Sequence, residues 1–288
     1  MSKYRCIVAG SLGVGGRALL DELESRNEWD VFALSRRKPD FSSRANFISV
    51  DLGNLDDTKS AAKEMSGATH IFFAAYSPQP TLAEEVGPNL SMLKNLVTSV
   101  ESTSPQLRHV AIVQGSKWYG NHLGPYKTPA KEDDPRHMPP NFYYDQQDWI
   151  EAYQKGKQWN WSSWRPHGFC GTSVGSAMNQ LTGLAIYATI SRELGLPLRF
   201  PGSPAAFKAV YQFTDASLLA RALLWGSGKS CLCEPRLQPY ERRIRTLGEH
   251  LARDRRMLRY APRASSNHQP FAFHGRQRAA MGADLREA

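Results

Sequence analysis

Short apolar runs alternate with amphipathic stretches over most of the chain. The runs predict strands at residues 4–9, 29–35, 45–50, 70–75 and 109–114, and the stretches between them predict helices at 15–25, 56–66 and 84–101. The run at 70–75 is mostly apolar, which is typical of a strand covered on both faces of a parallel sheet. This alternation predicts an α/β fold with a doubly wound parallel sheet.

The pattern continues less regularly through the second half of the chain. Residues 120–142 are rich in proline, glycine and charge and predict a loop. Beyond it, the spacing predicts helices at 143–157, 177–194 and 215–225 and strands at 162–166 and 207–213. Asp215 is placed to cap the last of these helices. The apolar periodicity becomes poor from residue 226 onward.

A glycine-rich turn joins the first predicted strand to the first predicted helix. Gly10, Gly13 and Gly16 follow the spacing GxxGxxG. The first glycine permits a tight turn, the second lets the backbone approach a pyrophosphate, and the third lets helix and strand pack closely. The N-terminus of the helix then faces the anion. A plain strand–helix turn is the other reading, but the position at the first junction favours a Rossmann-type dinucleotide site.

The end of the second strand indicates which dinucleotide binds. A site for NAD places Asp or Glu there to hold the ribose 2′-hydroxyl, whereas this strand ends in Ser35, Arg36 and Arg37. Two guanidinium groups suit a 2′-phosphate, so the sequence predicts NADPH. The two arginines can also be read as solvated loop charges. Asp51 and Leu52 follow the third strand and are predicted to bind the cofactor, with Asp51 at the adenine; a turn cap is the other reading of Asp51.

The helix predicted from residue 143 lacks a pair that is common in similar proteins. The glycine spacing, strand order and length resemble the extended short-chain dehydrogenase/reductases, most of which carry a lysine four residues after a tyrosine. Here Gln147 stands four residues after Tyr143, and Asp148 stands four after Tyr144.

Two other motifs resemble one subfamily, the progesterone 5β-reductase and iridoid synthase-like enone reductases. Their tyrosine lies in an NFYY motif, which this chain carries within NFYYDQQD at 141–148, and their lysine comes earlier, as in QGSKWYG at 114–120. WRPHG at 164–168 and AMN at 177–179 are also similar to that subfamily, and the resemblance covers residues 4 to about 226. Trp118 departs from the more usual histidine.

The resemblance implies a reaction and its residues. Tyr143 matches the catalytic tyrosine and Lys117 its partner, and Tyr119 and Phe142 are expected to line the substrate pocket. In conjugate reduction, a hydride adds to the β-carbon of an enone and negative charge develops on the carbonyl oxygen. A phenol hydrogen bond and a nearby ammonium stabilise that charge. We therefore expect NADPH-dependent reduction of a small-molecule enone.

Two alternatives to this function remain open from the sequence. One is a nucleotide-sugar epimerase or dehydratase-like enzyme, which would use NAD and the spacing that is absent here. The other is a non-catalytic NADP-binding sensor, which would generally lack the tyrosine. Within these motifs, Tyr144 is expected to be a packing residue, and His167 is expected to be structural.

The net charge of +9 is unevenly distributed. Residues 229–288 contain one lysine and twelve arginines against six acidic residues, whereas the rest of the chain has a net charge of +2. We therefore expect an NADP-binding Rossmann domain at 1–165 with its catalytic helix from 143, a partial substrate-binding region at 166–228, and an atypical arginine-rich segment at 229–288.

Three explanations compete for the arginine-rich segment. A nucleic-acid-binding tail is disfavoured because no known module and few aromatic residues accompany the arginines. A lineage-specific extension is the second. The third is a frameshift near residue 228, because one allowed choice of codons for 229–261, read out of phase, encodes AFNLTNG and RW as the family carries there. We favour the frameshift, and expect this chain to bind NADPH but to reduce enones poorly or not at all.

The remaining composition constrains location and partners. The four cysteines suggest no disulfide framework, and the histidines show no metal-ligand spacing. No apolar run approaches the length of a membrane span, and the N-terminus does not resemble a signal peptide. We expect a soluble cytoplasmic protein with no metal, no nucleic-acid partner and no membrane contact; a homodimer is left open.

Overall fold

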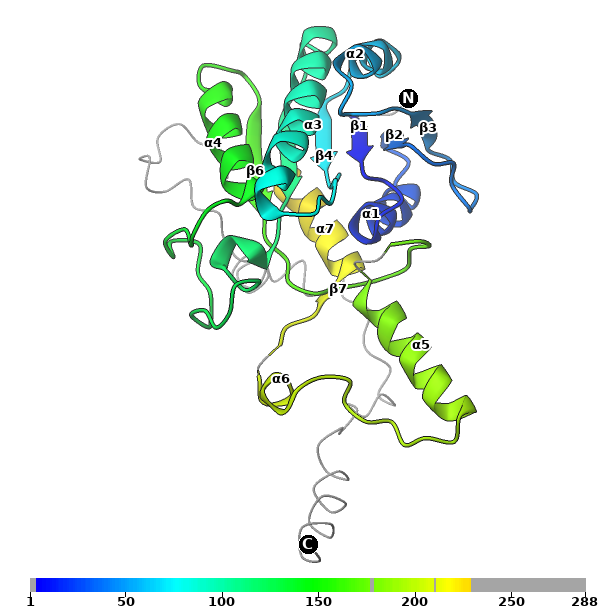
Figure 1. Cartoon of the computed structure of the whole chain (residues 1–288). Helices are drawn as coiled ribbons and strands as arrows, with labels where there is room; N and C mark the ends of the chain where they lie inside the picture. The colour runs from blue at the N-terminus through cyan, green and yellow to red at the C-terminus, as the bar shows by residue number, and fades with distance from the viewer. Residues whose placement is uncertain (1–3, 177–178, 210, 229–288) are drawn as a thin grey trace, which may run out of the picture. The chain divides into compact units, whose positions relative to one another are not determined.

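The structure is a computed structural model that describes residues 4–176, 179–209 and 211–228. Its strands are β1 (Tyr4–Ala9), β2 (Trp29–Ser35), β3 (Asn46–Ser49), β4 (His70–Phe73), β5 (His109–Val113), β6 (Asn160–Trp164), β7 (Phe169–Cys170) and β8 (Thr214–Asp215). Its helices are α1 (Val14–Glu24), α2 (Leu55–Glu64), α3 (Leu82–Thr103), α4 (Phe142–Gln154), α5 (Gln180–Glu193), α6 (Pro204–Lys208) and α7 (Ala216–Ser227), with a 3₁₀ turn at Ser116–Tyr119 (Figure 1).

Six parallel strands form the main sheet in the order β3-β2-β1-β4-β5-β6. The central strand β1 pairs with β2 on one side and with β4 on the other. The strand order therefore reverses beside β1, and this switch point is where open α/β sheets bind ligands at the carboxyl ends of their strands. The predicted doubly wound parallel sheet is confirmed.

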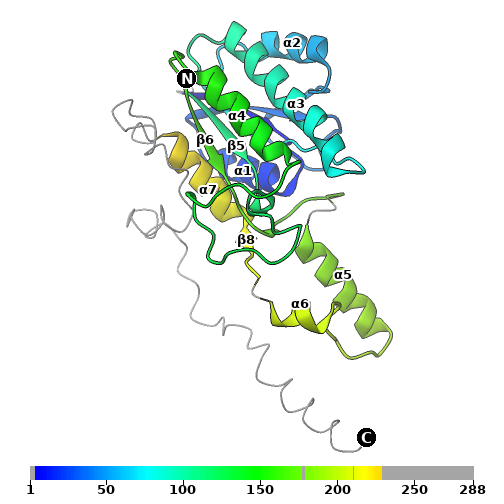
Figure 2. The ribbon, with the colours of Figure 1, turned by 60° about the vertical axis from the view of Figure 1, so that its left-hand side comes forward.

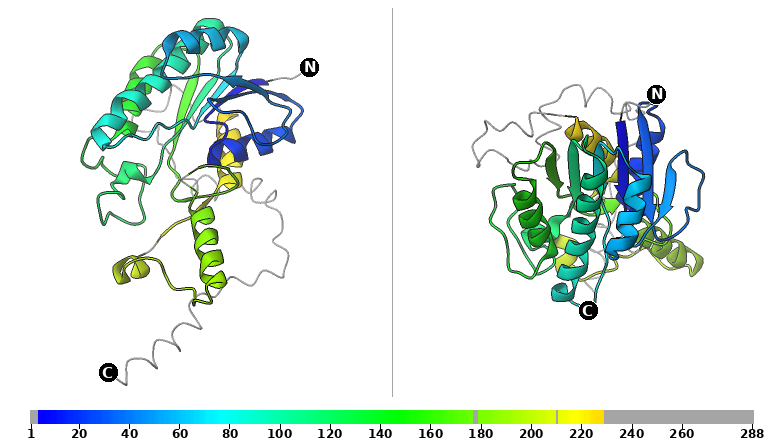
Figure 3. Two further views of the ribbon diagram at one scale, coloured as in Figure 1. Left: turned by 45° about the vertical axis from the view of Figure 1, so that its right-hand side comes forward. Right: turned by 90° about the horizontal axis from the view of Figure 1, so that it is seen from above.

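Helices cover both faces of this sheet. α1 and α7 pack against each other on one face, and α2, α3 and α4 form a row on the other (Figure 2 and Figure 3). Ile7 and Ala9 of β1 belong to the apolar core that α3 covers with Leu93. Cys6 and Val8, at the alternate positions, are fully buried toward the opposite face. Burial on both faces explains why Cys6 to Ala9 of this strand are all apolar.

The C-terminal end of α3 is fixed by a carboxylate that accepts three hydrogen bonds. Glu101 accepts from the Tyr153 hydroxyl at 2.6 Å, the Trp159 indole at 2.8 Å and the Lys157 ammonium at 2.9 Å. Burial alone would raise the pKa of Glu101, but these hydrogen bonds lower it below its usual value. The carboxylate ties α3 to α4 and to the segment that leads into β6.

Two histidines lie opposite each other near the amino ends of β4 and β5. His70 and His109 are cross-strand partners and are almost fully buried. His70 lies 2.8 Å from the Thr69 hydroxyl, and His109 lies 2.8 Å from the Ser162 hydroxyl. Burial lowers the pKa of His70 to about 4 and that of His109 to about 3. Both rings are therefore neutral at physiological pH.

The predicted strand at 207–213 is wrong. Its first residues lie in the helix α6, because Ser203 is an N-cap whose hydroxyl accepts from the Ala206 amide at 3.1 Å and Pro204 occupies the first helical turn. The strand β8 begins just beyond the predicted range and pairs with β7 in a second, two-stranded parallel sheet.

The predicted cap on the last described helix is confirmed. Asp215 accepts a hydrogen bond from the Leu218 amide at 2.8 Å and so begins α7. Because α7 packs on α1, this part of the expected substrate region contributes to the layers of the main sheet. The expected domain boundaries remain a prediction. The arginine-rich segment at 229–288 and its frameshift hypothesis lie outside the described residues.

The helix predicted at 177–194 is observed as α5, and residues 177–178 are outside the description. Several of its apolar side chains are exposed, among them Leu184, Ile186 and Ile190. Within the described ranges, no helix combines the length and apolar character that crossing a membrane requires.

Candidate active site

The glycine turn between β1 and α1 has a backbone that side chains would not permit. Gly10 has a φ of +78°, and a Cβ there would lie 2.6 Å from the Ala74 carbonyl oxygen. A Cβ on Gly16 would lie 2.2 Å from the Gly10 carbonyl oxygen. Gly13 donates its amide to that same carbonyl at 3.0 Å and is the N-cap of α1, with no side-chain cap. The turn therefore presents bare backbone at a helix N-terminus, which suits a phosphate.

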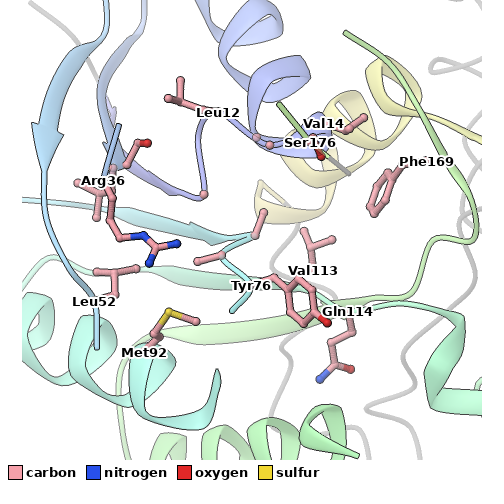
Figure 4. A pocket seen from close by; sticks show the side chains of 18 of the residues that line it. Leu12, Val14, Arg36, Leu52, Tyr76, Met92, Val113, Gln114, Phe169 and Ser176 are labelled. Carbon is pink, nitrogen blue, oxygen red and sulfur yellow. The ribbon is translucent and has the colours of Figure 1, made fainter. Parts of the chain in front are cut away.

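A cleft of about 590 Å³ opens over this turn at the carboxyl edge of the sheet. Figure 4 shows Arg36 and Leu52 toward one side of it and Tyr76, Gln114 and Phe169 toward the other. The predicted site residues that line the cleft are Gly10, Gly13, Gly16, Ser35, Arg36, Arg37, Asp51, Leu52, Lys117, Phe142 and Tyr143. Tyr119 is not among its lining residues. Motifs more than a hundred residues apart thus meet in one cavity.

The end of the cleft next to β2 carries the two arginines. Arg36 and Arg37 are exposed and directly follow β2, and the Ser35 hydroxyl accepts the Arg37 amide at 3.1 Å. The Arg37 guanidinium also donates to the Val174 carbonyl at 3.4 Å. Asp51 accepts the Gly53 amide at 3.0 Å, so it does form the turn that was its alternative reading. Its contact with adenine remains a prediction.

Lys117 and Tyr143 line the other end of the cleft, and one amide side chain, that of Asn141, contacts the backbones of both. Asn141 donates to the Lys117 carbonyl at 2.8 Å and accepts the Tyr143 amide at 3.2 Å as the N-cap of α4. Gln114 donates to the Tyr143 carbonyl at 2.8 Å and accepts from the Ser163 hydroxyl at 2.7 Å. The turn after β5 and the start of α4 are therefore held in a fixed relation.

The Tyr143 side chain lines the cleft, and its hydroxyl lies next to Gly115. It approaches Gly115 so closely that a Cβ there would be 3.1 Å away. Burial raises the pKa of Tyr143, and the nearby Tyr76 and Glu85 raise it further. The phenol therefore keeps its proton at neutral pH. Among the described residues no hydrogen bond to this hydroxyl is found, so it can donate to an oxygen in the cleft.

Glu85 and Tyr76 are site residues that the sequence analysis missed. Glu85, near the start of α3, accepts a hydrogen bond from the Tyr76 hydroxyl and lies 3.5 Å from the Lys117 ammonium. Burial raises the pKa of Tyr76, and the bond to Glu85 adds to this. One available signal was that Tyr76 lies three residues beyond the end of the buried strand β4, because side chains just beyond the carboxyl ends of parallel strands gather at the site.

Two other candidates, Tyr144 and Tyr119, do not line the cleft and make packing contacts elsewhere. The Tyr144 hydroxyl donates to the Trp118 carbonyl at 2.6 Å and accepts the His137 amide at 2.8 Å, which makes it a buried packing residue. Arg165 lies 3.5 Å from the centre of the Trp118 ring and donates to the Tyr119 hydroxyl at 3.3 Å. Tyr119 therefore belongs to a cation–aromatic cluster, and its assignment to the substrate pocket stays a prediction.

The remaining sequence candidate is His167. His167 makes an edge contact with the Tyr211 ring at a centroid distance of 4.5 Å and does not line the cleft. In the part of the chain that the structure describes, no group of three or more His, Cys, Asp or Glu side chains is arranged to hold a metal ion.

Comparison with known proteins places the chain in a family. The model of the PRISE-like Rossmann-fold domain matches residues 51–230. An uncharacterized protein of Schizosaccharomyces pombe is 35% identical over 241 residues, covering 79% of this chain and 59% of that protein. The 3-oxo-Δ4,5-steroid 5β-reductase of Arabidopsis thaliana is 31% identical over 240 residues, covering 77% and 60%.

Further relatives give the same picture. The (S)-8-oxocitronellyl enol synthase of Camptotheca acuminata is 30% identical over 235 residues, covering 77% of this chain and 60% of that enzyme. The chain thus spans about 60% of the length of these relatives. Among solved structures, UDP-glucose 4-epimerase of Thermotoga maritima superposes with a TM-score of 0.62 at 15% identity, covering 77% of this chain and 72% of that one, which shows the fold alone.

The family model, the matching fold and the resemblance found in the two motifs agree. The chain belongs to the family of proteins with a PRISE-like Rossmann-fold domain.

Proposed function

We propose that the cleft binds NADPH and that Tyr143 and Lys117 promote reduction of a C=C bond conjugated to a carbonyl. The residues fit the cofactor, because Gly10 and Gly16 leave a cradle that any Cβ would fill. Arg36 and Arg37 stand where a 2′-phosphate would lie, and no acidic residue ends β2. The observation that carries the proposal is that Lys117 and Tyr143 line this same cleft, together with the glycines of the turn and the two arginines.

When bound, the reduced nicotinamide supplies the hydride. The task left to the protein is to stabilise the negative charge that the carbonyl oxygen gains. Tyr143 donates its hydroxyl proton in a hydrogen bond to that oxygen, and a raised pKa keeps the donor protonated throughout. Lys117 adds a positive charge to the same end of the cleft, which strengthens stabilisation in a partly buried site.

The epimerase alternative receives no support from the contacts of α4. Gln147, in the position where the common lysine would stand, accepts a hydrogen bond from Arg165 at 3.1 Å. Asp148 is paired with Arg136 at the surface. Neither side chain supplies the ammonium group that such enzymes place on this helix. The relatives named for steroid 5β-reduction and for 8-oxocitronellyl enol synthesis support enone reduction instead.

The first experiment tests the cofactor. We expect fluorescence titration to show NADPH binding at least tenfold more tightly than NADH, because the 2′-phosphate gains charge-assisted contacts. Arg36→Ala and Arg37→Ala together should remove most of this preference and leave NADH binding unchanged. Arg192→Ala, in the exposed helix α5, is the matched control. Equal affinity for both dinucleotides in the parent chain would overturn the cofactor assignment.

The second experiment tests the reaction. Because residues 229–288 depart from the family's sequence pattern, we propose that the chain retains cofactor binding but reduces enones slowly. NADPH oxidation with cyclohexenone is measured in single turnovers, on this chain and on a version extended with the C-terminal part of a relative. Tyr143→Phe should slow hydride transfer about a hundredfold in the extended version. NADPH binding without any oxidation in either version would favour the non-catalytic sensor.

A further inference from the structure

Glu85 is an unexpected neighbour for the proposed reaction. Its side chain is only 6% exposed and lies near the start of α3, beside the cleft. One carboxylate oxygen accepts the Tyr76 hydroxyl, and the other lies 3.5 Å from the Lys117 ammonium. A lone buried carboxylate here would oppose the negative charge that forms on a substrate carbonyl. Its charge must therefore be offset within the site.

The position of Glu85 is held by contacts that do not involve Lys117. Asn89, fully buried one turn later, donates to the Glu85 carbonyl at 2.8 Å. The same amide group donates to the Ser77 carbonyl at 2.8 Å, and its oxygen accepts the Ser77 amide at 2.9 Å. Gln146 of α4 donates to the Asn89 carbonyl at 3.0 Å. These bonds join α3, the segment that carries Tyr76 and the helix that carries Tyr143.

The charges around Glu85 indicate which group offsets it. Burial lowers the pKa of His122, the Lys117 charge lowers it further, and Glu85 acts in the opposite direction. At Tyr143, Glu85 raises the pKa in addition to burial and Tyr76. In the described part of the chain, Lys117 is the cation that forms an ion pair with Glu85. The carboxylate thus acts on the catalytic phenol, and the ammonium is its counter-charge.

We propose that Glu85 is the positioning residue for Lys117. It holds one side of the ammonium group, its charge is offset by that group, and the remaining N–H bonds of Lys117 are left to face the cleft. Tyr76 occupies the other carboxylate oxygen and fixes the orientation of the carboxylate. The catalytic value of this arrangement rests on the proposed function, whereas the positioning itself does not.

The arrangement predicts an asymmetry between its two members. Removing the lysine leaves an almost fully buried carboxylate without a counter-charge, which is costly. Removing the glutamate charge leaves Lys117 with 29% of its side chain exposed, so that water can solvate the ammonium. Glu85→Gln also keeps an oxygen that can accept from Tyr76. The lysine variant should therefore be the more damaged of the two, and the second substitution should repair part of the damage.

The test is a double-variant cycle on the full chain without cofactor or substrate. We expect Lys117→Met to lower the thermal midpoint by about 5 °C and Glu85→Gln by less. The double variant should unfold at a higher temperature than Lys117→Met alone. Additive losses, or a double variant below both single variants, would overturn the proposal, because two unrelated sites add independently.

A kinetic arm tests the consequence for the reaction, on the extended version of the chain. Glu85→Gln should slow single-turnover hydride transfer about tenfold while the NADPH Kd changes less than twofold. Glu101→Gln is the matched control. Glu101 lies on the same helix as Glu85 but away from the cleft, and its carboxylate is likewise bound to a tyrosine and a lysine. An unchanged rate for Glu85→Gln in an active parent would overturn the positioning role. If the parent transfers no hydride, the proposed function fails and the thermal cycle alone decides.

Discussion

Two carboxylates on α3 are bound by the same kinds of partner, yet their surroundings differ. Glu85 and Glu101 each accept a tyrosine hydroxyl and each face a lysine. Glu101, with 22% of its side chain exposed, is saturated by three donors at 2.6 to 2.9 Å. Glu85 is more deeply buried, yet its lysine stands farther away at 3.5 Å and lines a cleft.

The difference shows how the same types of side chain can either fasten helices together or line a cleft. At the amino edge of the sheet, protein donors satisfy the carboxylate and the cluster fastens α3 to its neighbours. At the carboxyl edge, the glycine turn and the switch point leave a cavity, so part of the hydrogen-bonding capacity faces that cavity. Incomplete pairing inside the protein therefore distinguishes the candidate site from the clamp, the cluster of Glu101 with Tyr153, Lys157 and Trp159.

The largest effect should come from closing the cavity itself. Gly10→Ala forces a Cβ to within 2.6 Å of the Ala74 carbonyl at a φ of +78°. We expect a loss of about 2–4 kcal/mol in the free energy of unfolding and at least a hundredfold weaker NADPH binding. Urea unfolding and fluorescence titration measure the two effects.

A matched glycine tests whether the loss comes from that position. Gly183 lies in α5, where an added Cβ meets nothing within 4 Å. Gly183→Ala should raise the free energy of unfolding by up to about 1 kcal/mol and leave cofactor affinity unchanged. If Gly10→Ala binds NADPH normally, the cleft is not the cofactor site. The carboxyl edge of the sheet would then not differ from the amino edge in binding a ligand.

The next effect concerns the histidines at the amino edge. Their folded pKa values, about 4 for His70 and about 3 for His109, lie below the unfolded value. The unfolded chain therefore binds more protons as the pH falls below about 6.5, and the folded state loses stability there. From pH 7 to 5 each histidine should remove about 2 kcal/mol from the free energy of unfolding.

Urea unfolding across this pH range measures the slope. His109→Gln should flatten it by about 2 kcal/mol, because glutamine does not titrate. His137→Gln, in an exposed loop, controls for the substitution itself. Cofactor affinity at pH 7 should be the same in all three proteins. A slope that His109→Gln does not alter would show that the buried pair plays no part in acid destabilisation.

A somewhat smaller effect is expected at the clamp. Glu101→Gln replaces an ionised acceptor of three hydrogen bonds and should cost about 1–2 kcal/mol in the free energy of unfolding. Since the cluster lies away from the cleft, the NADPH Kd should not change. Weakened binding in this variant would mean that the two carboxylates are coupled along the helix and are not the separate units described above.

The smallest effect separates the two readings of Asp51. Asp51→Asn keeps an oxygen that can accept the Gly53 amide, so stability should stay within about 0.5 kcal/mol. If the carboxylate also meets the adenine, NADPH affinity should fall about threefold, as expected for one exposed charge-assisted hydrogen bond. An unchanged titration curve would leave the turn as its whole role.

The parts of the molecule that could be predicted are those encoded by local periodicity and spacing. The strands from β1 to β5 follow from apolar runs, and the cleft's glycines and arginines follow from their places at strand ends. Residues 207–213 contain β-prone aromatic residues, but the Ser203–Pro204 pair starts a helix that includes the first of them, so the predicted strand does not form.

The contribution of Glu85 could not be predicted in the same way. Its partners stand nine residues earlier, at Tyr76, and thirty-two residues later, at Lys117. Only the packing of α3 beside the turn after β5 brings the three together. The spacing marks Glu84, three residues after Thr81, as a capping-box residue but assigns no partner to Glu85, whose role depends on the face of α3 that turns toward the protein.

The Asn141 side chain has a consequence for how this site can be altered. In a helix that carries both members of a tyrosine–lysine pair, the helical pitch dictates their separation. Here the two residues sit on separate segments joined by one amide group, which contacts both backbones. The gap between phenol and ammonium is thus an adjustable dimension. Changing that gap to suit a bulkier or smaller carbonyl compound means altering the turn at 116–119 together with the Asn141 cap of α4, because the hydrogen bonds of Asn141 couple the two.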